Sequence, residues 1–405
     1  MSIEGTCEPR FEQVREEFER NFAERGEVGA SVCVTVEGET LVDLWGGTAD
    51  PARGREWAQD TIGNVWSCTK AATALCAHML AYRGDLDVNA PVSTYWPEFE
   101  KNGKDGVLVR HLLNHQAGLP ALRQPLAPGS FYDWGLMTGA LAAEEPFWRP
   151  GTRNGYHGLT FGFLVGEVIR RVSGRSLGTF FREEVAGPLG LDFWIGLPEE
   201  HEPRVAPSIP ASPPGLGDAV PSFYVAALTD PSSVQALVAA NNGGYLMVAG
   251  ESDTRAAHAA EIGAAGGMTN ARGLAGMYRP LALGGGNLVD AGQLALMGAV
   301  SSATGVDAVL LIPTRWTLGF AKTVDDRYLP AADREAMLFS EEAFGHPGLG
   351  GSLGFADPRA RMSFGYTMNR QAMKLAIDER CQSLVDAVYR ALGYRRIGDG
   401  GPWYT

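Results

Sequence analysis

Ser67 and Lys70 stand three residues apart in NVWSCTKAATALCAHML, a segment with the apolar pattern of a helix. On a helix this spacing puts both side chains on one face, where the lysine amine can reach the serine hydroxyl. The chain contains 29 arginines and five lysines, and of these two residue types only lysine can lose its proton on burial. The pair therefore indicates a serine nucleophile with a lysine base, although a helix-capping serine beside a solvated lysine would give the same short motif.

The S-x-x-K motif is shared with penicillin-recognising serine enzymes. Three further segments follow it in the chain: VRHLLNHQAGLP, PGTRNGYHGLTFGFLVGEVIRRVSG and FGHPGLGGSLGFADPRARMSFGYTMNR. In order and spacing these segments resemble the β-lactamase-like serine hydrolases, most of all the branch that contains class C β-lactamases and family VIII carboxylesterases. Only about residues 200–262 lie outside the resemblance.

The resemblance implies a role for each matched residue. Ser67 matches the nucleophile, Lys70 the base, and Tyr156, in NGYHGL, the tyrosine of the family's Y-x-N motif. A phenol near cationic groups can be partly ionised, so Tyr156 could take the serine proton and return it to the leaving group. The backbone N–H groups of Ser67 and Leu349 would form the oxyanion hole.

The chain departs from the family's pattern at two motifs. The third position of Y-x-N is Gly158, which lacks the amide that helps to hold an acylamino substrate. His346-Pro347-Gly348 replaces the Lys-Thr-Gly of lactamases, and a neutral histidine supplies no fixed cation for a β-lactam carboxylate. Both departures fit family VIII esterases, which often lack an intact third motif. His346 could orient Tyr156 or the substrate, or be a structural histidine. Four residues are assigned to substrate binding: Trp66, His157, His346 and Gly348.

Two other motifs are weaker candidates. GGSLG at 350–354 spells the G-x-S-x-G elbow, but that elbow leads from a strand into a helix and needs a later histidine. A strand pattern follows Ser352, and no histidine follows His346. His111 and His115 are four apart and could share a metal on one helix face, but no third ligand stands out, so packing roles are favoured. We expect neither a metal nor a cofactor.

The elements that must position these residues follow from the periodicity of the apolar residues. Residues 199–222 are rich in proline and 223–262 in alanine and glycine, which predicts a loop or lid near 199–262. The predicted elements are, in chain order, a helix at 11–23, a hairpin at 30–36 and 39–46, helices at 67–83, 109–115, 133–143, 158–173, 176–186, 270–283 and 290–300, strands at 316–322, 350–357 and 361–369, and a helix at 376–392.

A hairpin needs further strands for stability, so the first hairpin is expected to join the three later strands in one antiparallel sheet covered by the two terminal helices. We therefore predict an α+β fold with two lobes, and the resemblance implies that it is of the β-lactamase/transpeptidase type. The sheet lobe comprises residues 1–62 and 306–405, and the mainly helical lobe comprises residues 63–305. The active site is expected between the lobes.

The composition of the chain limits the classes of partner that it can bind. Its 405 residues include 47 acidic and 34 basic side chains, for a net charge of −13, which argues against a nucleic acid or an anionic membrane surface. The five cysteines are few and scattered, a pattern typical of reduced thiols. The first residues lack the pattern of a secretory signal, and no apolar stretch approaches the ~20 residues of a membrane span. We expect a cytoplasmic protein; its oligomeric state stays open.

The favoured function is hydrolysis of small carboxylic esters through a covalent acyl group on Ser67, with a small-molecule ester or acyl compound as the only partner. One alternative keeps this chemistry but replaces water by an amine or alcohol, which gives an acyltransferase or amide-forming enzyme; an amide-cleaving enzyme is related to it. A weak β-lactamase is less favoured. A catalytically silent binding protein is the alternative from another class, and the intact Ser67, Lys70 and Tyr156 argue against it.

Overall fold

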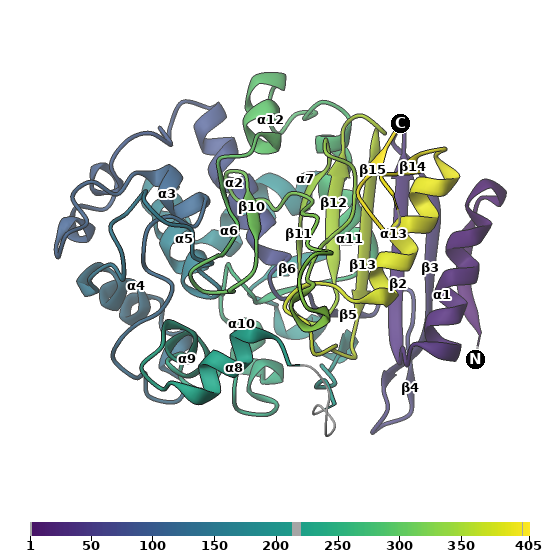
Figure 1. The fold of residues 1–405 in the computed structure, drawn as a ribbon, viewed down its shortest axis with the longest axis horizontal. Coiled ribbons are helices and arrows are strands. Elements are labelled where there is room, and N and C mark those ends of the chain that lie inside the picture. The colour runs from purple at the N-terminus through teal and green to yellow at the C-terminus, as the bar shows by residue number, and fades with distance from the viewer. Residues whose placement is uncertain (1, 213–219, 399) are drawn as a thin grey trace.

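The centre of the fold is a seven-stranded sheet with the order β1-β3-β2-β13-β12-β11, to which β4 is added beside β3 (Figure 1). A computed structural model describes residues 2–212, 220–398 and 400–405. All strand pairs of this sheet are antiparallel, and β2 pairs with β13 so that Val34 lies opposite Phe364. The strands are β1 (Ile3–Cys7), β2 (Gly29–Val36), β3 (Glu39–Asp50), β4 (Arg55–Glu56), β11 (Phe344–Pro347), β12 (Leu353–Asp357) and β13 (Met362–Met368).

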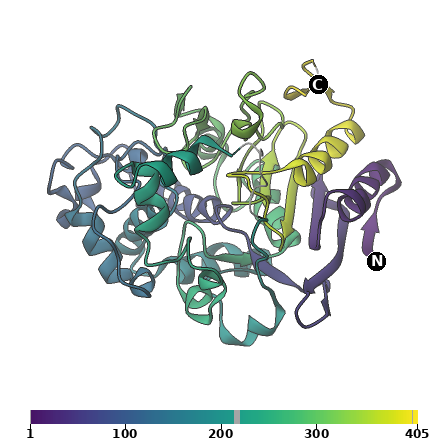
Figure 2. The same ribbon diagram turned by 60° about the horizontal axis from the view of Figure 1, so that its bottom comes forward.

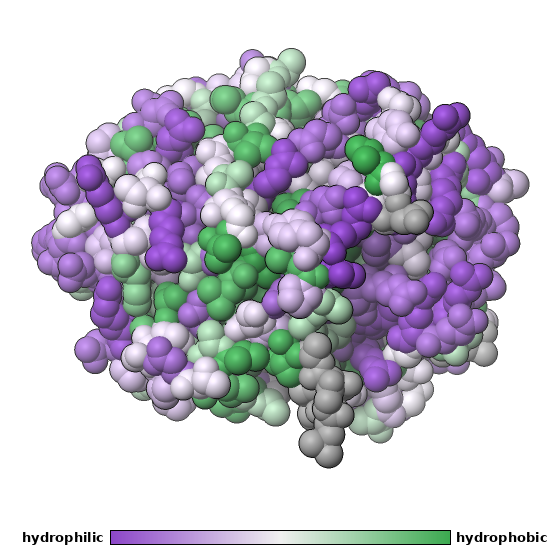
Figure 3. All heavy atoms as spheres, in the orientation of Figure 1, coloured by the Kyte–Doolittle hydropathy of each residue, from purple (hydrophilic) through white to green (hydrophobic). Residues whose placement is uncertain are grey.

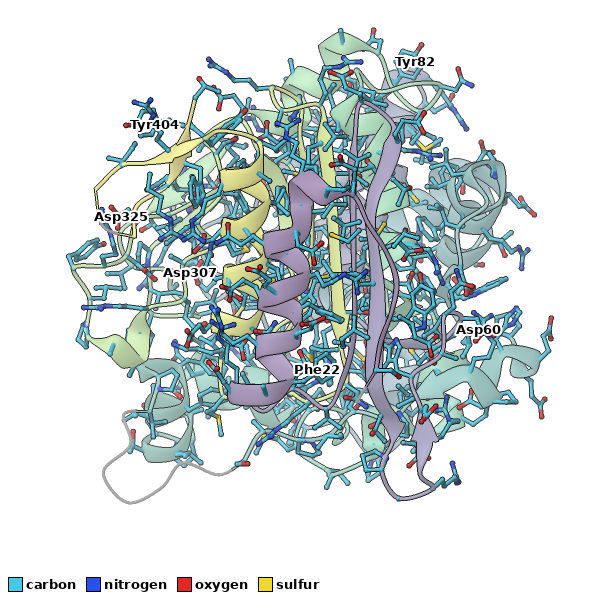
Figure 4. All side chains as sticks on the ribbon, turned by 90° about the vertical axis from the view of Figure 1, so that its right-hand side faces the viewer. Phe22, Asp60, Tyr82, Asp307, Asp325 and Tyr404 are labelled. Carbon is cyan, nitrogen blue, oxygen red and sulfur yellow. The ribbon has the colours of Figure 1, made fainter. Side chains whose placement is uncertain are left out.

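Both faces of this sheet are covered by helices, namely α1 (Glu12–Glu24), α11 (Ala271–Ala282) and α13 (Glu379–Ala391). Helices α1 and α13 pack side by side on one face, as Figure 4 shows. Successive side chains of a strand point to opposite faces, so Val32 and Val34 join the core beneath α1 and α13 whereas Cys33 packs on α11. Gly365 permits the close approach of α11, because a Cβ there would lie 2.2 Å from the carbonyl oxygen of Ala271.

The other large part of the chain is mainly helical and is built around α2 (Thr69–Tyr82) (Figure 2). Every residue of α2 from Thr69 to Leu80 is buried, which is typical of a helix surrounded by other elements. The remaining helices are α3 (Val109–Leu113), α4 (Trp134–Ala143), α5 (Thr160–Ser173), α6 (Leu177–Phe181), α7 (Gly187–Leu189), α8 (Ser222–Thr229), α9 (Val234–Ala240), α10 (Arg255–Ala259) and α12 (Ala291–Gly298).

Three smaller sheets complete the described part of the chain. One has four strands in the order β6-β8-β5-β7 and ends beside the start of α2, where the N–H of Val65 bonds to the carbonyl oxygen of Gly267. The other two are the pairs β9–β10 and β14–β15. Their strands are β5 (Ile62–Asn64), β6 (Phe193–Ile195), β7 (Val205–Ala206), β8 (Gly267–Thr269), β9 (Ser302–Thr304), β10 (Thr314–Trp316), β14 (Arg395–Arg396) and β15 (Trp403–Tyr404).

The predicted α+β architecture, with the first hairpin and the C-terminal strands in one antiparallel sheet under the terminal helices, is confirmed. The predicted strand at 316–322 is wrong. Only Trp316 of that range lies in a strand, and Gly319, at φ 99°, turns the chain so that the N–H of Thr317 bonds to the carbonyl oxygen of Phe320. The third C-terminal strand of the sheet is β11 instead. Helix α11 falls in the range assigned to the helical lobe but packs on the sheet.

The range 199–262 contains more regular structure than the expected loop or lid. Its described residues include β7, α8, α9 and α10, and the part of that expectation at 213–219 lies outside the described residues. Within the described residues, no helix combines the length and the apolar character that crossing a membrane requires.

Candidate active site

Ser67 lies at the turn that leads from β5 into α2. The preceding residue, Trp66, has a φ of 48°, a left-handed conformation that is an outlier for a bulky residue and is typical of functional sites. The side chain of Asn64 supports this turn by accepting a hydrogen bond of 2.8 Å from the N–H of Trp66. The turn holds Ser67 in a fixed place. Ser67 is also partly exposed, so a substrate can reach its hydroxyl.

Lys70, one helical turn later, is completely buried and directed at Ser67. Its Nζ lies 2.9 Å from Ser67 Oγ, 2.6 Å from the carbonyl oxygen of Gly158 and 2.8 Å from that of Ala264. Burial lowers the pKa of Lys70 well below its ordinary value. A neutral amine has two N–H groups and one lone pair; the two carbonyls take the N–H groups, which leaves the lone pair to accept the Ser67 hydroxyl. This is the geometry of a general base.

Tyr156 faces the same amine from the other side. Lys70 Nζ lies 4.8 Å from the centre of the Tyr156 ring, and the ring stacks on Trp316 with centroids 5.3 Å apart. Burial raises the pKa of Tyr156, and its hydrogen bond with Ser67 offsets only part of that rise. The expected partly ionised phenolate is therefore not favoured here. The raised pKa favours a neutral phenol at Tyr156, which can donate its proton.

Three histidines surround this centre and are neutral. His346 lies on β11, where its Nδ1 donates to the carbonyl oxygen of Pro347 at 2.8 Å; burial, with the nearby Lys70, lowers its pKa to about 3. His157 is completely buried, accepts the N–H of Leu119 at Nε2, and has its pKa lowered to about 3 by burial.

His115 packs on the ring of Tyr156, with centroids 4.9 Å apart, and its Nδ1 accepts the N–H of His157 at 3.1 Å. Burial also lowers its pKa well below the usual range. The two histidines therefore brace the segment that carries Tyr156. His157 lines neither of the two pockets at the centre, so its assignment to substrate binding has no support from its position.

The two residues of the predicted oxyanion hole, Ser67 and Leu349, come from separate segments of the chain. Ser67 and Leu349 line the same pocket, and within the described residues neither backbone N–H donates to an acceptor. Gly348 explains how they approach one another, because a Cβ at that position would lie 2.3 Å from the carbonyl oxygen of Val65. Glycine is required for this contact between β11 and the turn before α2. Gly348 thus acts through backbone packing.

A pocket of about 160 Å³ opens beside Ser67, and its walls are mostly apolar. Trp66, which was assigned to substrate binding, is among them. Figure 3 shows hydrophobic residues gathered on the face where this region lies, over α8 and toward the centre of the view. The exposed apolar side chains of this region include Val225, Leu228 and Met247. The residues that line the pocket beside Ser67 and Tyr156 include Trp66, Leu159, Phe223, Val238, Leu246 and Leu349.

Sequence reasoning missed two residues that shape this site. Asp307 is buried and accepts a 3.0 Å hydrogen bond from the N–H of Tyr156. Trp316 provides the flat surface on which Tyr156 stacks. Neither residue belongs to the motifs of Ser67, Lys70 and Tyr156. The only feature of the sequence that could have pointed to them was their presence in the apolar segment before residue 322.

The weaker motifs take structural places. Ser352 is completely buried and precedes strand β12, as predicted, rather than a helix. His111 accepts the N–H of Leu108 at Nδ1 and so caps α3. Within the described residues, no group of three or more histidine, cysteine or acidic side chains is arranged to hold a metal ion.

Comparison with known proteins shows the family of the chain. The Beta-lactamase family model matches residues 15–382. The chain is 34% identical over 392 residues to "Esterase/beta-lactamase LipL" of Mycobacterium tuberculosis, a match that covers 93% of this chain and 85% of the relative. "Esterase EstB" of Burkholderia gladioli is 33% identical over a shorter region, 43% of this chain and 48% of the relative.

Solved structures show the same fold over nearly the whole chain. A family VIII carboxylesterase superposes with a TM-score of 0.82 at 38% identity, covering 96% of this chain and all of the other. EstA from Arthrobacter nitroguajacolicus gives a TM-score of 0.82 at 29% identity, covering 97% and 99% of the two chains. The resemblance and the β-lactamase/transpeptidase-like fold inferred from the motifs are confirmed. The chain belongs to the beta-lactamase family and is a carboxylesterase-like serine hydrolase.

Proposed function

We propose that this enzyme hydrolyses small carboxylic esters through a covalent acyl group on Ser67, with Lys70 as the base and Tyr156 as the proton donor. The observation that carries the proposal is the environment of Lys70. Its amine is buried, is held by the carbonyl oxygens of Gly158 and Ala264, and lies 2.9 Å from Ser67 Oγ. A buried amine in this arrangement activates a hydroxyl near neutral pH.

In the first half of the reaction, Ser67 Oγ attacks the ester carbonyl carbon while its proton passes to Lys70. Negative charge develops on the carbonyl oxygen, where the N–H groups of Ser67 and Leu349 stabilise it. The bond between the carbonyl carbon and the alcohol oxygen then breaks. Tyr156 gives its proton to the alcohol oxygen and regains one from Lys70, so the alcohol leaves neutral and Ser67 carries the acyl group.

In the second half, water takes the place of the alcohol. Its oxygen attacks the acyl carbon while its proton passes through Tyr156 to Lys70, and the bond to Ser67 Oγ breaks. The proton then returns to Ser67, which restores the enzyme and releases the carboxylic acid. The residues of the chain supply every proton-transfer step, so this scheme needs no cofactor.

The charges at the site favour esters over β-lactams. A lactam carboxylate needs a fixed cation at the third motif, whereas burial lowers the pKa of His346 to about 3 and keeps it neutral. Gly158 offers no side-chain amide, and its carbonyl oxygen is already occupied by Lys70. A neutral acyl group bound in an apolar pocket needs neither a fixed cation nor a side-chain amide.

We assign the pocket beside Ser67 to the acyl group of the substrate and call it the acyl pocket. Its size favours a small substrate. Its volume of about 160 Å³ is below the roughly 300–1,000 Å³ of sites for drug-sized ligands. Its apolar walls suit a short alkyl chain, and one of the wall residues, Met247, is an exposed apolar side chain.

The test compares p-nitrophenyl butyrate hydrolysis by the wild type, Ser67→Ala and Ser352→Ala. Ser352 is the matched control because it is the serine of the G-x-S-x-G sequence, is buried, and its hydroxyl makes no hydrogen bond within the described residues. We expect Ser67→Ala to lose about 10⁴-fold or more of kcat, and Ser352→Ala to stay within a few-fold of the wild type.

A fluorophosphonate probe should label the wild type and Ser352→Ala but not Ser67→Ala. Equal hydrolysis by Ser67→Ala and the wild type would disprove the nucleophile. A folded wild type that neither hydrolyses the ester nor reacts with the probe would favour the silent binding protein.

A further inference from the structure

A second pocket, of about 70 Å³, adjoins the acyl pocket at Tyr156. The two pockets share only Tyr156, Leu310 and Leu375, and Ser67 lines the acyl pocket alone. Tyr156 is the residue that returns a proton to the departing alcohol in the proposed reaction. A group bound in the second pocket would therefore lie beside the proton donor and outside the acyl pocket, which is where the alcohol portion of an ester must be.

Three residues that line the second pocket have buried polar atoms without partners. The atoms are Trp316 Nε1, His346 Nε2 and Glu335 Oε1; each belongs to a residue that lines the pocket, and none has a hydrogen-bond partner among the described residues. All three residues are buried. Buried polar atoms in proteins are almost always hydrogen-bonded, so three unpartnered ones around one pocket indicate a site for a polar group.

The tautomer of His346 defines one of these positions. Because Nδ1 donates to the carbonyl oxygen of Pro347, the neutral ring presents a lone pair at Nε2. Trp316, which stacks on His346 with centroids 5.7 Å apart, offers an N–H donor. The pocket thus supplies both a donor and an acceptor, which are what a hydroxyl group needs.

Glu335 adds a carboxyl group that the local backbone holds in place. Its Oε2 accepts the N–H groups of Leu375 and Ala376, each at 3.0 Å, and Leu375 lines both pockets. Its Oε1 lies 3.6 Å from Lys374 Nζ, beyond hydrogen-bond distance. The amine of Lys374 instead donates to the carbonyl oxygen of Arg334 at 2.8 Å.

The surroundings of Glu335 favour a neutral hydroxyl over a cationic group. Burial raises the pKa of Glu335 to about 7, so near neutral pH the carboxyl group can donate or accept a hydrogen bond. Two cationic side chains, Arg315 and Lys322, line the pocket, as does the carboxyl group of Asp326, whose pKa is raised by burial. An ammonium group would meet these two cations there.

We infer that this second pocket binds the alcohol portion of the substrate and selects a compact alcohol that carries a further hydroxyl group, as in the monoester of a small diol or triol. The inference rests on the proposed esterase function. Glu335 and His346 bind the free hydroxyl, and the esterified oxygen lies beside Tyr156. When the bond between the acyl carbon and this oxygen breaks, the proton from Tyr156 goes to it and the diol leaves intact.

The test compares two esters that deliver the same butyryl group. In 2-hydroxyethyl butyrate a hydroxyl stands where propyl butyrate has a methyl group of similar size. We expect the wild type to show a kcat/KM about tenfold higher for the hydroxyethyl ester. The ratio of the two kcat/KM values is the readout, because changes in the activation of Ser67 affect both esters equally.

Glu335→Gln and Glu342→Gln form the matched pair of variants. Glu342 is exposed and pairs with Arg359 away from the pocket. We expect Glu335→Gln to lower the ratio several-fold and Glu342→Gln to leave it at the wild-type value. The wild-type ratio alone keeps the inference testable if Glu335→Gln fails to fold.

Each outcome separates this inference from the proposed function. Equal kcat/KM values for the two esters in a wild type that hydrolyses p-nitrophenyl butyrate would overturn the hydroxyl subsite and leave the esterase function standing. A higher kcat/KM for butyrylcholine than for the hydroxyethyl ester would show that the pocket takes a cation and would also overturn it. Loss of all ester hydrolysis in the wild type would remove both proposals.

Discussion

The backbone N–H of Tyr156 donates a 3.0 Å hydrogen bond to Oδ1 of Asp307, a buried carboxylate 151 residues later in the chain. The same oxygen accepts the N–H groups of Val309 and Leu310, and Oδ2 accepts the hydroxyl of Thr314. Asp307 therefore ties Tyr156, the proposed proton donor, to the turn that carries Leu310, a wall residue of both pockets. It is a positioning residue, since it reaches the reaction only through Tyr156 and this turn.

We predict that Asp307→Ala lowers both the stability and the turnover of the enzyme. The change leaves one buried and two part-buried N–H groups without an acceptor, and a fully buried group of this kind costs roughly 1–3 kcal/mol. Asp307→Asn keeps the Oδ1 acceptor and should restore most of both properties. Thermal unfolding and kcat for p-nitrophenyl butyrate measure the two effects. An Asp307→Ala enzyme as stable and active as the wild type would show that Tyr156 needs no such support.

Lys70→Arg is predicted to lower activity strongly although arginine is also a long basic side chain. Arginine cannot be deprotonated in practice, so it cannot accept the proton of Ser67. We expect kcat to fall by about 10²–10⁴-fold, the usual contribution of a general base. The conservative control is Lys101→Arg at an exposed position, which should keep wild-type kcat. If Lys70→Arg retained more than a tenth of the activity, Lys70 would serve as a fixed charge and not as the base.

The lowered pKa of Lys70 has a consequence for the pH profile of the wild type. In the proposed mechanism the deprotonated amine is the active form, so kcat/KM should rise as Lys70 loses its proton and then stay constant. A lysine with its ordinary pKa near 10.4 would place that rise in alkaline solution. Burial moves it to a much lower pH, so activity should already be on its plateau well below pH 10. A profile that still rises steeply there would contradict a buried neutral amine.

Some contacts of the site could be predicted from the sequence, and others could not. The spacing of Ser67 and Lys70 is local to one helix turn, so the sequence alone indicated their contact. The pKa of Lys70 is lowered by burial, and the amine is held in its buried place by the carbonyl groups of Gly158 and Ala264, which are 88 and 194 residues away. No local pattern contains that information. Tyr156 could be assigned only through the resemblance to a family.

The fold shows the same division. The hairpin and the terminal helices were predictable because one face of each is apolar at a fixed period. The failed strand at 316–322 has a strand-like composition, but Gly319 takes a positive φ that an apolar count does not reveal. Asp307 and Trp316 were missed because their contacts with Tyr156 join segments that only the tertiary fold brings together.

The last prediction concerns stability and His258, a buried residue of α10. Its Nδ1 lies 2.7 Å from Glu202 Oε1, and its Nε2 lies 3.9 Å from Asp253 Oδ1. Burial acts to lower the pKa of His258, but the two nearby carboxylates outweigh it and raise the pKa above the ordinary value. Arg255 also pairs with Glu202, and the carboxylate of Asp253 accepts the N–H of Ser208.

A pKa raised in the folded state means that protonated His258 stabilises the fold. This contribution is complete below the unfolded pKa, about 6.5, and is lost as the pH rises through the higher folded value. His258→Gln should therefore lower the midpoint of thermal unfolding more at pH 6 than at pH 9, by about 2 °C. Comparing the wild type with the variant at each pH cancels the effect of the titratable groups that both proteins share. An equal loss at the two pH values would mean that His258 contributes through packing alone, and a greater loss at pH 9 would reverse the sign of the proposed charge interaction.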